Sequence, residues 1–371
     1  MFELLKTDST SSARLGKLTT AHGVIETPIF MPVGTRATVK AVSPAELEAL
    51  EAQVILANTY HLWLRPGTEI IGKFGGLHNF MNWDKPILTD SGGFQVWSLA
   101  KLRKIEPEGV RFQSHLDGSA MFLSPEKSME IQATLGSDIV MAFDECPPYP
   151  CERDYAAKSL ELTLDWELRS RRWHDENPEQ TSQQLLFAIV QGSTFADLRE
   201  ESAKKLVEIG FDGYAIGGVS VGEPEDEMMK AVDHATPFLP ADKPRYAMGL
   251  GQPDQLVEMV ARGVDMFDCV LPTRVARHGT AYTEDGTINL KNKKFEDDER
   301  PISATTHPLC AGFSRGYIRH LLMQSEILGL RLVTLHNLHF YLSLMRQIRE
   351  AIEAGRFGEF RNDFVKRYRG A

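Results

Sequence analysis

The stretch DMFDCVLP (residues 265–272) is a short, mostly apolar run that closes on polar residues and proline, and its pattern recurs through this 371-residue chain. Seven other short apolar runs close on polar or glycine residues: TPIFMPVG (27–34), VILANTYH (54–61), PILTDSGG (86–93), DIVMAFDEC (138–146), LLFAIVQG (185–192), GYAIGG (213–218) and RYAMGLG (245–251). Amphipathic, helix-like segments separate most of them. Nearly continuous apolar strands are typical of parallel sheets covered by helices. Eight of them predict an α/β fold, one (β/α)8 TIM barrel over residues 1–371.

Turn and helix-start signals fit the same alternation. Ser43-Pro44-Ala45-Glu46 has the pattern of a capping box, and Ser124-Pro125-Glu126 opens a second helix similarly. The pairs Asp117-Gly118 and Asp285-Gly286 lie between strand-like runs and predict β-hairpins inserted into the barrel. After the eighth run the composition changes, and we predict an embedded C-terminal subdomain at about residues 275–345.

The polar residues that follow the apolar runs share one position in such a barrel. Functional groups of a (β/α)8 barrel gather where the strands end, at the C-terminal rim. Here the rim residues are Asn58, Asp90, Asp144, Gln191, Gly218 and Asp268. We therefore expect a site built from several strands at this rim.

The composition limits the partner and the compartment. A net charge of −10 argues against non-specific binding of polyanions, so a nucleic acid would have to meet a local basic patch. Lys291, Lys293 and Lys294, with Arg315 and Arg319, either form such a patch or are solvated charges. The four cysteines lack disulfide-like spacing, and the sequence shows no signal peptide and no apolar run of membrane-spanning length. We expect a cytoplasmic protein with no membrane partner.

Asp90 and Asp268 suit glycosidic chemistry. A carboxylate can capture an anomeric carbon through an oxocarbenium-like transition state, while a second acid or base handles the proton of the leaving or entering group. The alternative for each aspartate is a helix N-cap or a buried salt bridge. The segment Ser91-Gly92-Gly93 favours a ligand-facing loop, because glycine allows a planar ligand to approach the backbone amides closely.

Other rim residues are suited to reading a flat base. Asp144 can accept two hydrogen bonds from an amidine-like edge such as that of guanine, and Gln191 can read a carbonyl. The Gly217-Gly218 pair would let main-chain amides contact a base. Met248 and Tyr214 are candidates for the apolar walls of the pocket, with ordinary core packing as the alternative.

Six motifs together resemble a known family. TDSGGFQ (89–95), FDEC (143–146), VQGS (190–193), GYAIGGVSVGEP (213–224), YAMGLG (246–251) and DMFDCVLPTR (265–274) resemble those of bacterial tRNA-guanine transglycosylases, in the same order over nearly the whole chain. The resemblance implies that Asp268 is the nucleophile, which gives a covalent intermediate with the ribose of the wobble guanosine, and that Asp90 is the general acid/base. A deazaguanine base, in most bacteria 7-aminomethyl-7-deazaguanine, then replaces guanine in queuosine biosynthesis. The implied base-recognition residues are Asp144, Gln191 and Gly218, and the implied pocket lining is Ser91, Cys146, Val219 and Met248.

The same resemblance implies an RNA partner. The expected substrate is tRNA with a U-G-U anticodon loop, of the aspartate, asparagine, histidine and tyrosine types, whose target base is unstacked. Arg274 and Arg277 lie just past the nucleophile strand and are candidates for contacts with flanking uridines or phosphates. Solvated surface arginines are the alternative. The family also implies a homodimer.

A structural zinc ion is implied as well, at a motif where this chain departs from the family. The family holds zinc with three cysteines spaced C-x-C-x-x-C and a later histidine. Here Thr305 and His307 stand at the first two cysteine positions, followed by Cys310 and His336. His307, Cys310 and His336 are chemically sound ligands, so zinc with another fourth ligand is one expectation. Hydrogen bonds and packing in place of the metal are the other.

The incoming base and the catalytic role have alternatives. Val221 corresponds to a bulky valine that favours 7-aminomethyl-7-deazaguanine, whereas Ser220 resembles the eukaryotic members, so queuine salvage stays open. A non-catalytic subunit that binds tRNA would not need both Asp90 and Asp268. A retaining glycoside hydrolase would normally carry aromatic sugar platforms at the rim, which we do not find in the sequence.

Overall fold

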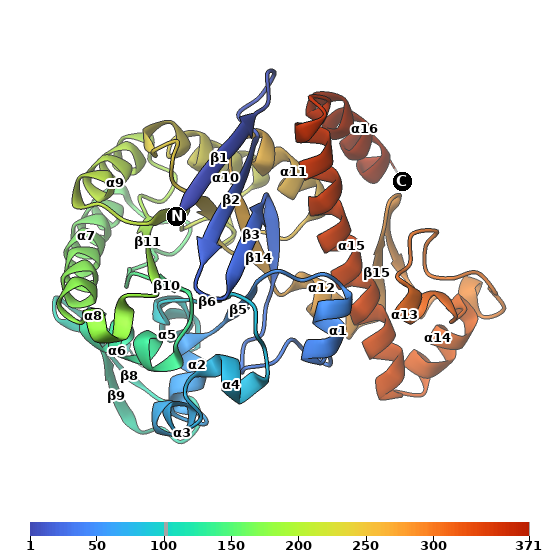
Figure 1. Ribbon diagram of the computed structural model, residues 1–371, viewed down its shortest axis with the longest axis horizontal. Helices are drawn as coiled ribbons and strands as arrows, with labels where there is room; N and C mark the ends of the chain where they lie inside the picture. Colours follow the sequence, from blue (N-terminus) through green and yellow to red (C-terminus); the bar gives the residue numbers. More distant parts are fainter. Residues whose placement is uncertain (100–102, 371) are drawn as a thin grey trace.

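The computed structural model describes residues 1–99 and 103–370, and its centre is an eight-stranded parallel sheet that nearly closes into a barrel (Figure 1). The strands are β4 (Ile29–Pro32), β5 (Ile55–Ala57), β6 (Ile87–Thr89), β10 (Ile139–Met141), β11 (Leu185–Val190), β12 (Gly213–Ile216), β13 (Arg245–Ala247) and β14 (Met266–Cys269). Their order in space is β4-β14-β13-β12-β11-β10-β6-β5. A parallel bridge between Val33 and Leu56 brings the ends of β4 and β5 together. All eight predicted strands, and the (β/α)8 class, are confirmed.

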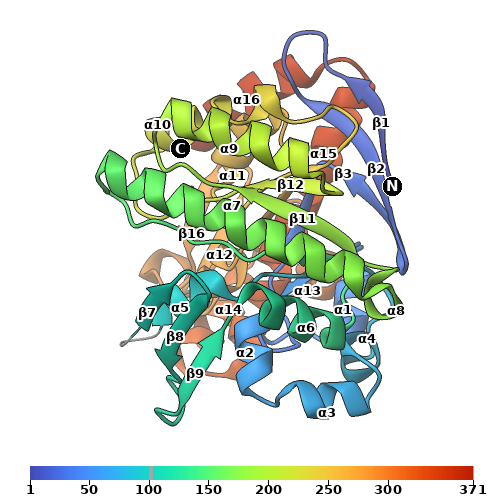
Figure 2. The same cartoon turned by 90° about the vertical axis from the view of Figure 1, so that its left-hand side faces the viewer.

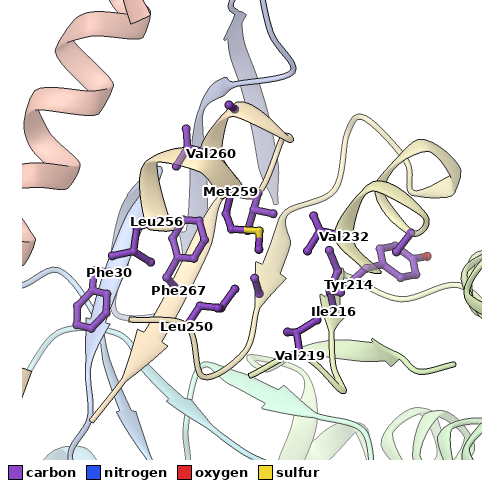
Figure 3. Close-up of a cluster of buried hydrophobic side chains, with 14 of the residues drawn as sticks. Phe30, Tyr214, Ile216, Val219, Val232, Leu250, Leu256, Met259, Val260 and Phe267 are labelled. Atoms are coloured by element: carbon purple, nitrogen blue, oxygen red, sulfur yellow. The ribbon is translucent and has the colours of Figure 1, made fainter. Parts of the chain in front are cut away.

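Side chains alternate along these strands between the barrel interior and the surrounding helices, as a period of two residues requires. One buried cluster contains the inward residues Ile29, Met31, Leu56, Leu88, Ile139, Met141, Phe187, Ile189, Ala215, Tyr246 and Met266. A second contains their outward neighbours, including Phe30, Val140, Leu186, Ala188, Tyr214, Ile216 and Phe267. Figure 3 shows Phe267 of this outer layer beside Leu256 and Met259 of α11 (Pro253–Ala261). Each large apolar side chain removed from water in this way contributes about 1.5–3 kcal/mol, so both faces of the sheet stabilise the barrel.

Helices cover the outside of the barrel. α6 (Pro125–Leu135), α7 (Arg153–Glu176) and α9 (Ala196–Ile209) lie together on one side, at the left of Figure 1 and facing the viewer in Figure 2. α15 (Ile327–Glu353) contacts β4 on another side. The other helices are α1 (Pro44–Ala49), α2 (Thr59–Leu64), α3 (Thr68–Lys73), α4 (Leu77–Met81), α5 (Gly93–Leu99), α8 (Pro178–Thr181), α10 (Glu225–Asp233), α12 (Leu271–Ala276), α13 (Pro308–Ala311), α14 (Arg315–Met323) and α16 (Phe357–Arg369).

The predicted helix starts and hairpins are confirmed. Ser43 caps α1 in a reciprocal capping box with Glu46, and the Ser124 hydroxyl caps α6. The Asp117-Gly118 turn joins β8 (Gly109–Gln113) to β9 (Ala120–Leu123), with β7 (Arg103–Glu106) as the third strand of that sheet. The Asp285-Gly286 pair joins β15 (Thr280–Thr283) to β16 (Gly286–Asn289).

An N-terminal antiparallel sheet was not predicted. It consists of β1 (Phe2–Thr7), β2 (Arg14–Thr20) and β3 (Gly23–Thr27). Phe2, Leu18 and Ile25 of this sheet belong to the same buried cluster as the inward residues of the barrel. The sheet therefore covers the end of the barrel where the strands begin, opposite the rim.

The segment after the barrel lies to one side, at the right of Figure 1. β15, α13 and α14 contact the long helix α15, which continues past the predicted subdomain boundary at residue 345. Across residues 1–99 and 103–370, no helix has both the length and the apolar character that are needed to cross a membrane.

Candidate active site

A cavity of about 590 Å³ opens at the C-terminal ends of the barrel strands. The predicted residues that line it are Asn58, Asp90, Ser91, Asp144, Cys146, Gln191, Gly218, Val219, Met248, Asp268 and Arg274. Strand periodicity explains why they converge, because Asp90, Gln191 and Asp268 each follow an inward-facing residue of their own strand by two positions. Tyr214 packs in the outer core instead and is not among the lining residues.

Asp268 is held at the end of β14 by two donors on one oxygen. Its Oδ1 accepts hydrogen bonds from the Tyr246 hydroxyl and from the Gly249 amide, the latter at 2.8 Å. Burial raises the pKa of the Asp268 carboxyl, and the two donors lower it in part. Burial also raises the pKa of Tyr246 well above its ordinary value, so the phenol stays protonated and remains a donor. This arrangement fixes the carboxylate and leaves Oδ2 as the oxygen available for attack.

Asp90 lies across the same cavity with its own pair of donors. The Asn58 side-chain amide donates to Oδ2, and the Thr59 backbone amide donates to Oδ1 at 2.8 Å. Burial raises the pKa of Asp90 to about 6, the two donors oppose that shift, and the negative charge of Asp268 adds to it. A carboxyl group that titrates near neutrality can both give and take a proton, as a general acid/base must.

Asp144 and Gln191 form a recognition pair on the neighbouring strands β10 and β11. The Gln191 side-chain amide donates to Asp144 Oδ2 at 2.8 Å, and the Ser91 hydroxyl donates to Oδ1 at 3.3 Å. Burial raises the pKa of Asp144 to about 6. The Gln191 carbonyl oxygen is buried and has no hydrogen-bond partner within residues 1–99 and 103–370. The pair therefore offers a planar ligand a carboxylate acceptor and an amide group that can both donate and accept hydrogen bonds.

The loop after β12 is shaped by glycines and by one acid. A Cβ at Gly217 would lie 2.6 Å from the Gln191 amide nitrogen, and Gly218 adopts a positive φ of 61°. Glu223 accepts hydrogen bonds from the backbone amides of Ser220 and Val221, the latter at 2.8 Å. Because Gly217 and Gly218 carry no side chain, their backbone can lie directly at the cavity.

The two cysteines in the cavity are not suited to act as nucleophiles. Burial raises the pKa of Cys146 to about 12, with the negative charges of Asp144 and Glu145 acting in the same direction. Burial and the charge of Asp268 raise the pKa of Cys269 to about 11. Both groups are therefore neutral thiols at physiological pH, and the carboxylates remain the candidate nucleophiles.

The predicted RNA-contacting arginines lie at the end of α12, Arg274 in its last turn and Arg277 at its C-cap. Arg274 is exposed and lines the mouth of the cavity, whereas Arg277 is exposed but is not among the lining residues. Within the subdomain, Arg315 donates to the Ile302 carbonyl at 2.7 Å, and Arg319 donates to the Asn292 carbonyl at 3.2 Å. These last two arginines brace the segment after the barrel, which leaves the exposed Lys291, Lys293 and Lys294 as the solvent-facing part of the expected patch.

The predicted zinc ligands are engaged in other contacts. The buried Cys310 thiol faces the Leu332 carbonyl at 3.5 Å, and burial raises its pKa to about 12. His336 Nε2 lies 2.7 Å from the Tyr282 carbonyl, so it carries the proton, and Nδ1 faces the Thr306 hydroxyl at 3.4 Å. These contacts satisfy both side chains without a metal ion.

The neighbouring positions give the same picture. His307 caps α13, with Nδ1 accepting from the Leu309 amide at 3.2 Å, and the Thr305 hydroxyl donates to Glu284. His307, Cys310 and His336 do not come together as a metal-binding group, and the residues present do not fit a zinc ion.

A different trio does cluster, at the opposite end of the barrel. His22, His78 and Asp138 are the one group of three or more His, Cys, Asp or Glu residues in the described chain whose ligand atoms all lie within 4.8 Å of one another. The two imidazole rings are stacked with centroids 3.6 Å apart and planes 15° from parallel. His22 Nδ1 lies 2.9 Å from Asp138 Oδ1, and His78 Nε2 lies 3.2 Å from Asp138 Oδ2, so both rings contact the buried carboxylate.

Several residues of the site were missed at the sequence level. Tyr246 orients Asp268, and Glu223 holds the loop after β12. Asn58, which orients Asp90, was expected at the rim, but this role was not predicted. Gln95 also lines the cavity and hydrogen-bonds to Asp90. Tyr246 could have been predicted to face the barrel interior from the period of two residues along its strand. The contacts of Glu223 depend on a turn, which no periodicity predicts.

Comparison with known proteins agrees with this site. The family model described as "Queuine tRNA-ribosyltransferase" matches residues 8–370. A queuine tRNA-ribosyltransferase of Bacillus subtilis (strain 168) is 58% identical over 368 residues, which cover 99% of this chain and 96% of the relative. One of Listeria innocua serovar 6a is 58% identical with the same coverage, and one of Halothermothrix orenii is 56% identical, with 99% and 97% covered. The chain therefore belongs to the queuine tRNA-ribosyltransferase family of glycosyltransferases.

Proposed function

We propose that this tRNA-guanine transglycosylase replaces the wobble guanine of tRNAs that carry a U-G-U anticodon loop with 7-aminomethyl-7-deazaguanine, as a step in queuosine biosynthesis. The proposed substrates are the tRNAs for aspartate, asparagine, histidine and tyrosine. One observation carries the proposal: Asp90, Asp144 and Asp268 line a single cavity at the barrel rim. Such a cavity supplies a nucleophile, a proton carrier and a base reader to one ligand.

In the first half of the proposed reaction, Asp268 Oδ2 forms a bond to the anomeric carbon of the ribose. The bond from that carbon to the glycosidic nitrogen breaks, and its electron pair leaves with guanine. Asp90, with a pKa near 6, gives the departing base a proton, so guanine leaves neutral. The RNA is then held on the enzyme as an ester of Asp268.

In the second half, the incoming base attacks the same carbon and reverses these changes. Its ring nitrogen loses a proton to Asp90 and forms the new glycosidic bond, and the ester bond to Asp268 breaks. The carboxylate and the protonated Asp90 are restored, so no external energy source is required. The hydrogen bonds from Tyr246 and Gly249 stabilise the carboxylate that is released.

Asp144 is the proposed reader of the base. Its carboxylate accepts from the ring N–H and the exocyclic amine that guanine and its deaza analogues share, while Gln191 and the Gly218 amide serve the carbonyl side. Ser91, Cys146, Val219 and Met248 complete the walls. Val221 also lines the cavity, which supports the small aminomethyl base, and queuine remains the alternative incoming base.

The RNA is proposed to cover the mouth of the cavity with its target nucleotide unstacked. Arg274 at the mouth and Arg277 at the C-cap of the same helix are the proposed contacts to flanking uridines or phosphates. A homodimer is proposed from the exposed apolar residues at the end of α14 and the start of α15, Met323 (52% exposed) and Ile327 (69% exposed).

The test is base exchange in the presence of a tRNA that carries the U-G-U loop. Wild-type protein is incubated with labelled guanine, 7-aminomethyl-7-deazaguanine or queuine, beside Asp268→Asn and the exposed control Asp226→Asn. We expect label in the RNA with wild type and with Asp226→Asn, a complex of RNA and protein that survives denaturation, and neither with Asp268→Asn. Undiminished exchange by Asp268→Asn would refute the proposal, and binding without exchange by wild type would indicate a non-catalytic subunit.

A further inference from the structure

Arg199 on α9 is fully buried directly behind the loops that carry the base-reading residues. Across residues 1–99 and 103–370, no carboxylate lies within ion-pair distance of its guanidinium. A buried guanidinium is costly unless its donors are satisfied. Within the described residues, the Arg199 guanidinium donates four hydrogen bonds, and all four go to backbone carbonyls. An arginine in that position serves the backbone around it rather than a charged partner.

The four carbonyls belong to two adjacent strand ends. Nε donates to Ser193 at 2.6 Å and Nη1 to Val190 at 3.4 Å, both at the end of β11. Nη2 donates to Gly217 at 3.0 Å and to Gly218 at 3.3 Å, just past β12. The planar fork therefore ties together the two loops that present Gln191 and Gly218 to the cavity.

Peptide geometry carries this anchoring into the cavity. In a trans peptide the carbonyl of one residue and the amide of the next point in opposite directions. Because Arg199 holds the Gly217 carbonyl, the Gly218 amide has to point the other way, and it does so toward the Cys146 thiol in the cavity wall. The orientation of this donor is thus set by a side chain that does not itself line the cavity.

Two glycines leave the space that Arg199 and Gln191 occupy. Gly192 has a φ of 136°, and a Cβ there would lie 2.8 Å from the Arg199 backbone nitrogen and 3.0 Å from its Cγ. A Cβ at Gly218 would lie 2.7 Å from Gln191 Oε1 and 3.4 Å from Arg199 Nη2. The arginine and the two loops are therefore packed as one unit.

We propose that Arg199 is a positioning residue for base recognition, which holds the Gly217-Gly218 peptide so that the Gly218 amide faces the bound base. The inference rests on the proposed function for the identity of the ligand. It assigns specificity to a residue outside the cavity, and it predicts that base affinity depends on the guanidinium fork rather than on positive charge alone. Lysine would keep the charge and lose the fork.

The experiment compares Arg199→Lys and Arg199→Met with wild type and with Arg349→Met. Arg349 is the control, because it also donates to a backbone carbonyl, that of Pro28 at 2.9 Å, but at the opposite end of the barrel, where it pairs with Glu26 at 3.8 Å. Guanine binding is measured by calorimetry, and KM is measured separately for guanine and for tRNA in the exchange reaction. Thermal unfolding and circular dichroism report on folding.

We expect Arg199→Met to weaken guanine binding about tenfold or more, equivalent to one lost hydrogen bond, and to raise the KM for guanine in proportion. The KM for tRNA should stay within about twofold of wild type, whereas partial unfolding would lower kcat and leave both KM values unchanged. Arg199→Lys is the second variant, and we expect it to fold even if Arg199→Met does not, because it keeps the positive charge. It should also weaken guanine binding and raise the KM for guanine. Unchanged guanine affinity in a folded Arg199→Lys overturns the inference. Failure of wild type to bind guanine overturns the proposed function itself.

Discussion

Replacement of Asp144 by asparagine should weaken guanine binding about 100-fold. In wild type, Asp144 is 8% exposed, and its two oxygens already accept from Gln191 and Ser91 at 2.8 Å and 3.3 Å. Asparagine replaces one acceptor with a donor, so a buried N–H of the ligand or of Gln191 loses its partner. A lost hydrogen bond to a charged group and the unsatisfied donor together cost about 3 kcal/mol, which is roughly a factor of 100 in the dissociation constant.

The same substitution should abolish part of the pH dependence of binding. Burial raises the pKa of Asp144 from its ordinary value of 3.8 to about 6. Protonation below that pH removes an acceptor, so wild-type affinity for guanine should be constant above pH 7 and fall by up to tenfold per unit below about pH 6. Asp144→Asn cannot titrate there, so its weak binding should vary less with pH.

Calorimetric titration with guanine at pH 5, 6, 7 and 8 measures both effects. The control is Asp226→Asn, since Asp226 is an exposed acid on α10 that pairs with the exposed Lys230 at 3.5 Å. Equal guanine affinity for wild type and Asp144→Asn at pH 8, or the same decline toward pH 5 in both, would show that Asp144 does not read the base.

Three further predictions concern the nucleophile, the RNA and the metal. Tyr246→Phe removes a donor from Asp268, so the pKa of Asp268 should rise further, and kcat should fall about tenfold or more in single-turnover exchange with little change in either KM; an unchanged kcat would exclude this role. Arg274→Ala should raise the KM for tRNA and reduce the slope of log affinity against log salt by about 1, with a smaller effect of Arg277→Ala outside the cavity, and equal salt slopes in all three proteins would contradict a phosphate contact. Elemental analysis should find much less than one zinc per chain, a chelator should leave the melting temperature unchanged, and Thr305→Cys with His307→Cys should create chelator-sensitive zinc binding; stoichiometric zinc in wild type would show that the ligands rearrange around an ion.

The strands of the barrel were predictable because their signal is local. Each run is nearly all apolar and ends on a glycine or a polar residue, and both features follow from burial between a filled interior and a layer of helices. The N-terminal sheet was not predictable in this way, since the buried positions of β2 are Arg14 and Gly16 as well as Leu18, and β1 buries only Phe2. Its strands are stabilised by packing against the apolar residues at that end of the barrel, and this packing depends on the whole fold.

In the candidate site, too, some residues could be predicted from local sequence spacing and others could not. Asp90, Gln191 and Asp268 could be placed from their spacing within strands, because a period of two determines which side faces the barrel axis. Arg199 gives no such signal, since its sequence neighbourhood is that of an ordinary charged helix and its importance arises from four carbonyls on two other segments. The zinc motif shows the opposite case, because three residues of plausible ligand type are present in the sequence, yet the structure does not bring them together.

The sheet formed by β1, β2 and β3 limits where bases can enter and leave the barrel. With Phe2, Leu18 and Ile25 packed beneath the inward layer of the barrel, the described chain is filled on the side opposite the rim. In the proposed reaction, the outgoing and incoming bases must therefore use the entrance that the RNA also occupies. Turnover then depends on how readily the anticodon loop moves away from that entrance. A higher affinity for the RNA would therefore slow the exchange of bases.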